Sequence, residues 1–288
     1  MKIFDCFSFF NELELLELRL HTLNDIVDYF VLVEPSKTYT NKDRDFVFEQ
    51  NKEKFKDFLH KIIYVKVTDL PDGPDAWVRE NYQRDCISRG IVDAAPDDLI
   101  IISDLDEIPN PGKIEQCANI KIPASFEQKL YYYYVNCLNT RTLWNGSIAV
   151  RKKYLPSPQQ LRAARGKTIR LLKSRVFWNR MRVKTPFLNI EDGGWHFSYM
   201  GGVDRIIEKV RALAHTEINT ERTNSADFIK KTMESGGDMF EGIYKDNRIS
   251  LFKKKGPPHK FVQIDDTYPK YITKLIQKYP YLYFNPNG

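Results

Sequence analysis

The most informative part of this chain reads Ile100-Ile101-Ile102-Ser103-Asp104-Leu105-Asp106-Glu107-Ile108-Pro109. Its apolar start follows two acids and its end meets a proline, which predicts a central strand of a parallel sheet with both faces covered. Ligands of such sheets bind beyond the carboxyl ends of the strands. Asp104 and Asp106 would share one face at that end, so one metal-bound ligand could contact both side chains.

The acids at this strand end predict a site for a divalent metal ion. Hard carboxylate oxygens suit Mn²⁺ or Mg²⁺, and these ions keep open positions for substrate phosphates. Glu107 points away from that face and is expected to brace the loop through backbone N–H groups. A strand-end turn that binds no ligand is the alternative, because acids are also common in turns.

Strand and helix signals alternate through the first hundred residues. Apolar, β-prone segments predict strands at residues 3–7, 29–33 and 61–67. Helices are predicted at residues 51–60 and 76–88. Asn11 is expected to cap a further helix that carries a stripe of leucines. Four strand–helix units in succession predict an α/β fold, with a mostly parallel central sheet flanked by helices.

The pattern changes after Pro111. Strands are predicted at residues 126–135 and 146–151, in a mixed or antiparallel extension of the sheet. A glycine-hinged loop that begins at residue 190 is expected to run into another strand. Helices are predicted at residues 203–215, after a cap at Ser225, and at residues 269–279.

Composition indicates a soluble globular protein. The chain has 288 residues, of which 42% are hydrophobic, and this is enough for one large domain with a real core. No stretch reaches the roughly 18 apolar residues that span a bilayer, and the start lacks the features of a signal peptide. The four cysteines are scattered, which indicates neither a zinc site nor a disulfide framework. A cytoplasmic location is expected.

The basic charge of the chain is concentrated in residues 151–184. This segment holds twelve lysines and arginines and no acid, although the whole chain has a net charge of only +6. Such a segment could meet a phosphorylated substrate or make peripheral contact with an anionic membrane surface. A solvated face or a loop is the alternative. No nucleic-acid partner is expected, because no nucleic-acid-binding motif accompanies the charge.

A parallel α/β half that carries Asp-x-Asp at the end of its fourth strand, followed by a smaller mixed region, is typical of nucleotide-sugar transferases of the GT-A type. Four segments together resemble glycosyltransferase family 17. They lie at residues 4–12, 30–34, 97–109 and 193–199. The resemblance implies an inverting transferase that uses UDP-GlcNAc and Mn²⁺ and forms a β linkage. The sequence does not identify the acceptor, for which a glycan or a lipid-linked glycan is the expectation.

One domain over residues 1–288 is expected, because the sequence has no internal repeat and no low-complexity tract. Residues 1–110 would be its nucleotide-binding half, and residues 111–288 its acceptor-binding half with the C-terminal helices. In this arrangement Asp106 would bind the metal directly, and Asp104 would reach the donor ribose or a metal-bound water. The bound metal would neutralise the charge that builds up on the departing diphosphate.

Nucleotide contacts are expected from the ends of the first two strands, which lie beside the metal strand. Asn11 follows the first strand, although capping a helix is an equal alternative for it. Glu34 ends the second strand, where its carboxylate could accept a hydrogen bond from uracil or a ribose hydroxyl. Arg84 is expected to contact the diphosphate or the base, and a surface ion pair with Glu80 is its alternative.

An inverting transfer needs a general base near the acceptor hydroxyl. Asp192 is the expected base and Glu191 the second candidate, and the alternative is that both acids brace a turn. His196 is a candidate third metal ligand or a core residue, and His215 competes for the metal role. Trp195 would stack on a sugar ring or fill the core.

Two other functions remain open at this point. A metal-dependent phosphohydrolase also places Asp-x-Asp at the end of a parallel strand, but uses its first aspartate as a covalent nucleophile. Such enzymes carry the motif on an early strand, whereas four strand–helix units are predicted here. The second alternative is a non-catalytic sugar-binding protein, and the acids at positions 104, 106, 191 and 192 disfavour it.

Overall fold

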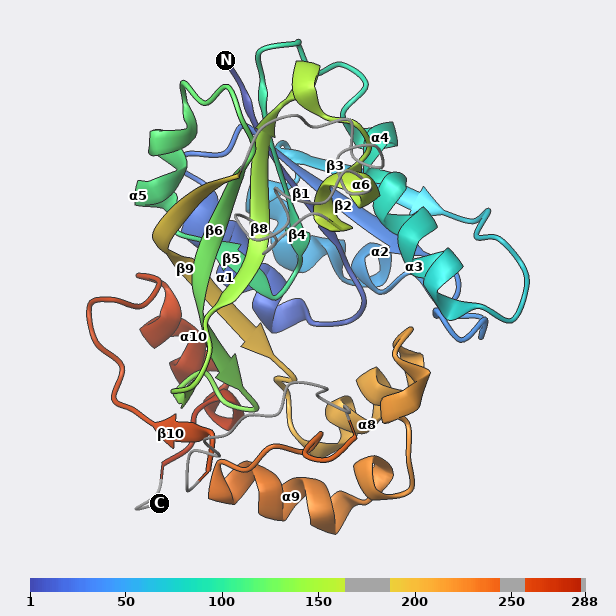
Figure 1. Ribbon diagram of the computed structural model, residues 1–288, viewed down its shortest axis with the longest axis vertical. Helices are drawn as coiled ribbons and strands as arrows, with labels where there is room; N and C mark the ends of the chain where they lie inside the picture. The colour runs from blue at the N-terminus through green and yellow to red at the C-terminus, as the bar shows by residue number, and fades with distance from the viewer. Residues whose placement is uncertain (164–186, 244–256, 286–288) are drawn as a thin grey trace, which may run out of the picture.

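A computed structural model describes residues 1–163, 187–243 and 257–285 of the chain. Within these ranges ten strands form one continuous sheet, and helices cover both faces of its amino-terminal half (Figure 1). The predicted α/β fold class is therefore confirmed. None of the helices described here has the length and apolar character that crossing a bilayer requires.

Four parallel strands form the amino-terminal half of the sheet, in the order β3-β2-β1-β4. Their bounds are β1 (Ile3–Ser8), β2 (Tyr29–Pro35), β3 (Ile62–Val67) and β4 (Leu99–Asp104). In β4, Leu99 and Ile101 pack on one face, and Ile100 and Ile102 pack on the other. A strand covered on both faces needs apolar side chains at successive positions, which explains the unbroken isoleucine run.

Beyond β4 the sheet becomes mixed, as predicted. The strands are β5 (Glu107–Pro109), β6 (Ala124–Tyr132), β7 (Cys137–Asn139), β8 (Trp144–Arg151), β9 (Leu188–Ser198) and β10 (His259–Phe261). β8 lies antiparallel to β4, β6 lies antiparallel to β8, and β9 lies parallel to β6. The pairing of β5 with β9 sets Glu107 opposite His196, and thereby joins two segments that are far apart in the sequence.

The loop predicted from residue 190 is wrong, because residues 188–198 form the single long strand β9. Its glycines serve close packing between strands. At Gly194, where φ is +136°, a Cβ atom would collide with the carbonyl oxygen of Ile108 on β5. Glycine is therefore required where β9 meets β5.

Helices flank the sheet and form the end of the molecule opposite the N-terminus. They are α1 (Leu13–Leu23), α2 (Val47–Asn51), α3 (Ala76–Asp85), α4 (Ile87–Gly90), α5 (Pro111–Ile114), α6 (Pro158–Ala163), α8 (Val203–Ala212), α9 (Ala226–Ser235) and α10 (Ile272–Lys278). Ser225 caps α9 by accepting a hydrogen bond from the Phe228 N–H, as predicted. The predicted cap at Asn11 is wrong: Glu12 occupies the N-cap position of α1, and no side chain caps that helix.

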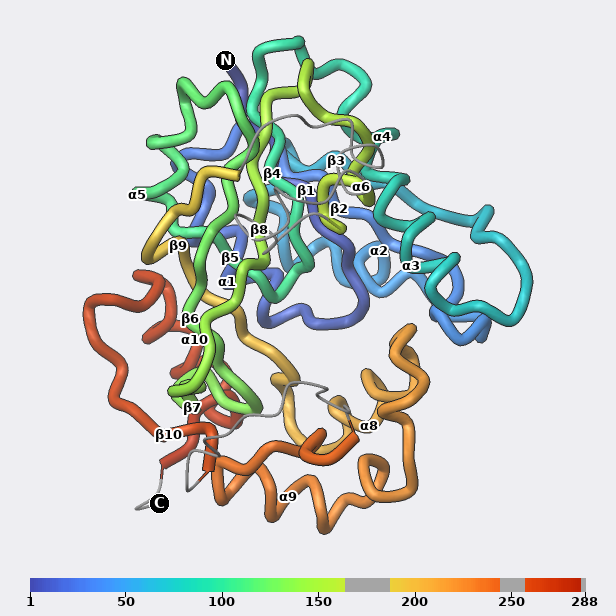
Figure 2. Tube along the Cα trace, in the orientation of Figure 1, coloured from blue at the N-terminus to red at the C-terminus, as the bar shows by residue number. Residues whose placement is uncertain are grey.

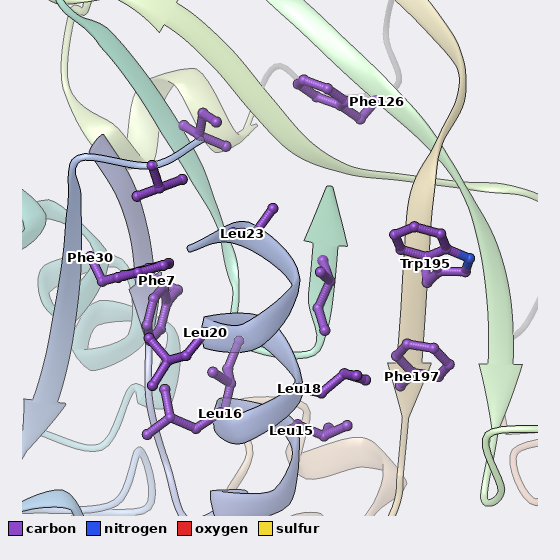
Figure 3. Close-up of a cluster of buried hydrophobic side chains, with 14 of the residues drawn as sticks. Phe7, Leu15, Leu16, Leu18, Leu20, Leu23, Phe30, Phe126, Trp195 and Phe197 are labelled. Carbon is purple, nitrogen blue, oxygen red and sulfur yellow. The ribbon is translucent and has the colours of Figure 1, made fainter. Parts of the chain in front are cut away.

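The core below the sheet is built largely by α1. Figure 3 shows Leu16 and Leu20 of this helix beside Phe7 and Phe30 of the first two strands, and Leu15 on the side of the helix that faces β9. All five side chains are buried, and full burial of one such side chain is worth roughly 1.5–3 kcal/mol. The opposite face of the sheet has its own cluster, to which α4 contributes.

A third apolar cluster belongs to α8 and α9. It includes Ile206 and Val210 from α8, and Ile229 and Met233 from α9. Figure 2 shows these helices at the end of the molecule opposite the N-terminus. This cluster holds α8 in place through its apolar face. Lys209, a polar side chain of the same helix, reaches Asp106 just beyond the end of β4.

Candidate active site

A cavity of about 850 Å³ lies at the carboxyl end of β4. It is lined by α3, by the turn after β4 and by α6, and also by the end of β9 and by α8. Its charged lining includes the acids Asp104, Asp106 and Glu107 and the cations Arg84, Arg162 and Lys209. The position agrees with the rule that parallel sheets bind ligands beyond the carboxyl ends of their strands.

The turn between β4 and β5 carries the acids of the Asp-x-Asp segment. β4 ends at Asp104, residues 105 and 106 form the turn, and β5 begins at Glu107. The Glu107 carboxylate accepts hydrogen bonds from the Asp104 backbone N–H at 2.8 Å and from the Trp144 indole N–H at 2.6 Å. Glu107 thus braces the turn through a backbone N–H, as predicted.

Arg19 holds the same turn from below. The Arg19 side chain is completely buried and forms a two-pronged ion pair with Asp5, at 2.6 and 2.7 Å. Its third nitrogen donates to the backbone carbonyls of residues 104, 105 and 107, each at 3.0 Å. Arginine is the side chain whose planar fork can serve a carboxylate and several carbonyls at once.

Asp104 is held by two arginines. Arg84 of α3 donates to its Oδ1 at 3.2 Å, and Arg162 of α6 donates to its Oδ2 at 2.6 Å. Burial disfavours the charge on Arg84, but Asp104 and Glu80 outweigh it and raise the pKa of Arg84. The predicted ion pair between Arg84 and Glu80 is also present, at 2.9 Å. The ion pair that the sequence suggested as the alternative is therefore present, and contact between Arg84 and the diphosphate or the base stays a prediction.

Asp106 lies against two residues from the carboxyl-terminal half. Its Oδ2 pairs with Lys209 of α8 at 2.9 Å, and its Oδ1 lies 3.5 Å from Nε2 of His196 on β9. Burial alone would raise the pKa of Asp106, but Lys209 and His196 hold it below its usual range. Asp106 is therefore a carboxylate ion at neutral pH.

Asp106 and His196 fit two adjacent ligands of one divalent ion. An octahedral ion with bonds of about 2.1 Å sets neighbouring ligand atoms roughly 3 Å apart, close to the separation of these two atoms. Within the part of the chain that the structure describes, no three His, Cys, Asp or Glu side chains form a metal site. At phosphate-binding sites, substrate phosphates and water usually fill the other positions of Mg²⁺.

Two of the expected nucleotide contacts lie outside the cavity lining. Glu34 is completely buried and accepts hydrogen bonds from the Val47 backbone N–H and the Tyr64 hydroxyl, so its oxygens serve the fold. Asn11 donates its side-chain amide to Glu208 of α8 at 2.8 Å. The geometry supports neither residue as a contact to the nucleotide, because both lie outside the cavity lining and protein groups bind the Glu34 oxygens and the Asn11 amide nitrogen.

The expected general bases are also distant from the Asp-x-Asp turn. Asp192 and Glu191 precede His196 on β9 by four and five residues, which is roughly 13 Å or more along a strand. Neither lines the cavity, and Asp192 instead lines a second cavity on the other side of β9. This placement does not support the base role that the sequence suggested for them.

Trp195 and His196 point to opposite faces of β9. Trp195 is part of the main core, and its indole N–H donates to the Thr267 carbonyl at 3.0 Å. It therefore fills the core and does not face the cavity that His196 lines. His215 lines another part of the cavity, beside α3. Its ring packs edge-on against the Trp77 ring, with 4.5 Å between the ring centres.

Three residues of this site were not assigned from the sequence. Arg162 lay within the basic segment without a role of its own, and residues 164–184 of that segment lie outside the described residues. Trp144 lies 5.0 Å from the His196 ring, between ring centres. Lys209 could have been noticed, because it falls on the same face of its helix as Ile206 and Val210.

Comparison with known proteins places the chain in a family. The model of glycosyltransferase family 17 matches residues 1–164, which include the Asp-x-Asp turn, Arg84 and Arg162. The human β-1,4-mannosyl-glycoprotein 4-β-N-acetylglucosaminyltransferase is 36% identical over 108 residues, and the rat enzyme of the same name is 33% identical over 117.

The match to these enzymes is partial. It covers 34% of this chain and 20% of the human enzyme, and 38% of this chain and 22% of the rat enzyme. The chain thus spans about a fifth of the length of the curated relatives it matches. Among solved structures, the inositol-1-phosphate CTP transferase from T. maritima is 11% identical with a TM-score of 0.38, over 69% of this chain and 89% of that one. Since the family model covers more than half of its 288 residues, the chain belongs to glycosyltransferase family 17.

Proposed function

We propose that this protein is an inverting, metal-dependent glycosyltransferase that moves GlcNAc from UDP-GlcNAc to a hydroxyl of a glycan acceptor and forms a β linkage. The observation that carries the proposal is the pair Asp106 and His196, whose ligand atoms lie 3.5 Å apart in a large cavity beside Arg84 and Arg162. The names of the relatives support the choice of GlcNAc as the transferred sugar.

The residues of the cavity would share the work as follows. Asp106 and His196 would hold Mn²⁺ or Mg²⁺, which when bound supplies positive charge to stabilise the departing diphosphate. Lys209 neutralises the Asp106 oxygen that faces away from His196, and so keeps that carboxylate in one orientation. Trp144 packs against the His196 ring and limits its rotation.

The general base is proposed to come from the cavity itself. Inversion requires a carboxylate near the acceptor hydroxyl, on the side of the sugar opposite the leaving group. Glu12 and Glu80 are cavity-lining carboxylates outside the Asp-x-Asp turn. Both oxygens of Glu12 accept hydrogen bonds, from Lys209 at 3.0 Å and from the Asn11 backbone N–H at 3.1 Å, whereas Glu80 pairs with Arg84 through one oxygen, so Glu80 is the better candidate.

The acceptor is proposed to be a glycan or a lipid-linked glycan. A lipid-linked acceptor would bring phosphates to the protein, and basic residues that follow α6 would be suited to meet them, with peripheral contact to a membrane surface. These residues lie outside the described ranges. The donor is proposed to be a nucleotide sugar in either case.

The proposal is tested by measuring UDP release from UDP-GlcNAc with Mn²⁺, with and without glycan acceptors. We expect acceptor-dependent release that is lost on chelation and in Asp106→Asn. Asp97→Asn serves as the control, because Asp97 is an exposed acid that pairs with two cations outside the cavity. Release of free GlcNAc without any acceptor would indicate a hydrolase, and failure of every UDP-sugar to bind would overturn the proposal.

A further inference from the structure

We propose that Asp104 is not a metal ligand, and that it instead positions Arg84 and Arg162 to bind the diphosphate of the donor. The inference rests on the proposed function, because it assumes a donor that carries a diphosphate. It separates the roles of the two aspartates in the Asp-x-Asp turn, and it assigns a binding role to Arg162.

Both oxygens of Asp104 are already taken by guanidinium groups. Arg84 holds Oδ1 at 3.2 Å and Arg162 holds Oδ2 at 2.6 Å. A divalent ion bound to either oxygen would lie next to one of these cations and would be repelled by it. Asp104 could bind a metal only if at least one arginine moved away.

The surroundings of Asp106 differ in this respect. Among the residues that the structure describes, one fixed cation, Lys209, contacts it, and that contact uses Oδ2. The other oxygen faces His196, which is a metal ligand when neutral. An ion held between Asp106 and His196 leaves the ion pair with Lys209 intact, so the metal position that needs no rearrangement lies at Asp106.

The two arginines are not free to move away from Asp104. Arg84 also donates to Glu80 at 2.9 Å and to Gln159 at 2.6 Å. Arg162 also donates to Glu107 at 2.6 Å and to the Gly146 carbonyl. Their side chains are only 6% and 3% exposed, so Asp104, whose own side chain is 36% exposed, links two buried and firmly held arginines.

Unused donor groups in this network indicate the kind of ligand. Arg84 and Arg162 both line the cavity, and within the described residues the Nη1 group of each donates to one protein acceptor, which leaves its second N–H for a ligand. Arginine forks match phosphate oxygens and bind them in pairs of hydrogen bonds. Two guanidinium groups joined by one carboxylate therefore suit a ligand with two linked phosphates.

The metal assignment is tested by the binding of Mn²⁺ alone, measured by electron paramagnetic resonance. We expect Asp104→Asn to bind Mn²⁺ within about threefold of the unmodified protein, and Asp106→Asn to bind it at least about tenfold more weakly. Asp97→Asn is the matched control, since Asp97 also pairs with two cations but lies outside the cavity. Loss of Mn²⁺ binding in Asp104→Asn equal to that in Asp106→Asn would overturn the proposal.

The diphosphate assignment is tested by calorimetry with UDP, UMP and uridine in metal-free buffer. Arg84→Lys and Arg162→Lys keep the charge but lose the fork, so we expect each to weaken UDP binding about tenfold and to leave uridine binding unchanged. Asp104→Asn should weaken UDP binding in the same way, because it removes the carboxylate that orients the two guanidinium groups toward each other. Arg89→Lys, in an exposed ion pair with Asp69, is the control.

The outcomes distinguish this inference from the proposed function. If UDP binds and both lysine variants bind it as tightly as the unmodified protein, the diphosphate role is wrong and the proposed function stands. If neither UDP nor UDP-GlcNAc binds with or without Mn²⁺, the proposed function itself fails. Thermal unfolding of each variant checks that the network change has not unfolded the protein.

Discussion

The guanidinium of Arg19, which lies on α1, donates to the backbone carbonyl of Asp104 at 3.0 Å from within the core. Arg19 thus ties the start of the Asp-x-Asp turn to the first helix, without using the Asp104 side chain. The same nitrogen holds two further carbonyls of the turn, and the other two nitrogens bind Asp5. The carboxylates of the turn are left to face the cavity.

Arg19→Met should destabilise the protein by about 3–5 kcal/mol, because it leaves the Asp5 charge buried without a partner. The free energy of unfolding in urea measures the loss. Replacing both partners, as in Arg19→Met with Asp5→Leu, should recover only part of it, because three backbone carbonyls still lack their donor.

Arg89→Met is the control for this prediction. Arg89 also forms a two-pronged pair, with Asp69, but both side chains are largely exposed. Such surface pairs are worth less than about 1 kcal/mol. Full recovery of stability in the Arg19 and Asp5 double variant would show that the three carbonyl contacts contribute little.

His196→Ala should weaken Mn²⁺ binding at least about tenfold, because it removes the ligand atom that lies 3.5 Å from Asp106. His215→Ala should leave Mn²⁺ binding unchanged, since His215 meets Trp77 and pairs with Glu217. Electron paramagnetic resonance of Mn²⁺ measures both. If Mn²⁺ binding is weaker in His215→Ala and unchanged in His196→Ala, His215 is the metal ligand and His196 is not.

Asp192→Asn should retain transfer activity within about threefold, whereas loss of a general base costs about 10²–10⁴-fold. Asp192 does not line the cavity. The variant should also fold normally, because Asp192 has a φ of +51° and asparagine tolerates this region well. UDP release with acceptor measures the effect, and a loss of a hundredfold would restore Asp192 as the base.

Glu17 should make the stability of the protein depend on pH. Burial alone would raise the pKa of Glu17, but hydrogen bonds from Lys278, Tyr271 and Tyr279 outweigh it and lower the pKa. A lowered pKa adds stability above the unfolded value of about 4.3, and this stability is lost as the pH falls through the folded value. These contacts join α1 to α10 and to the residues that flank it.

Glu17→Gln should therefore be less stable than the unmodified protein at pH 7, and the difference should shrink below about pH 4. Urea unfolding at a series of pH values from about 3 to 7 measures the difference. Glu53→Gln, at an exposed position, is the control. A difference that stays constant across this range would mean that the carboxylate charge of Glu17 contributes nothing.

Much of the fold could be predicted from local patterns. The run of isoleucines before Asp104 predicted a strand covered on both faces, and β4 is such a strand. The loop predicted from residue 190 was wrong because its glycines were read as a hinge. In the structure Gly194 allows β9 to pack closely against β5, and no local pattern distinguishes these two uses of glycine.

The candidate site was only partly predictable. Four predicted residues line the cavity: Arg84, Asp104, Asp106 and His196. They could be predicted because residue spacing shows where strands end and which residues share a helix face. Glu34 also lies at a strand end, yet it is buried under α2. Its carboxylate accepts hydrogen bonds from backbone N–H groups of that helix. Strand position predicts where a residue lies, but not which protein groups will already occupy its oxygens.

The sequence by itself determined that a strand of a parallel α/β sheet leads directly into Asp104 and Asp106. Apolar runs and strand periodicity, which show this, are local properties of the chain. Only the tertiary structure decided what surrounds these acids. Arg162 and Lys209 lie 58 and 103 residues away from the aspartates they contact. Their ion pairs depend on how α6 and α8 pack against the end of β4, and long-range packing of this kind leaves no pattern in the local sequence.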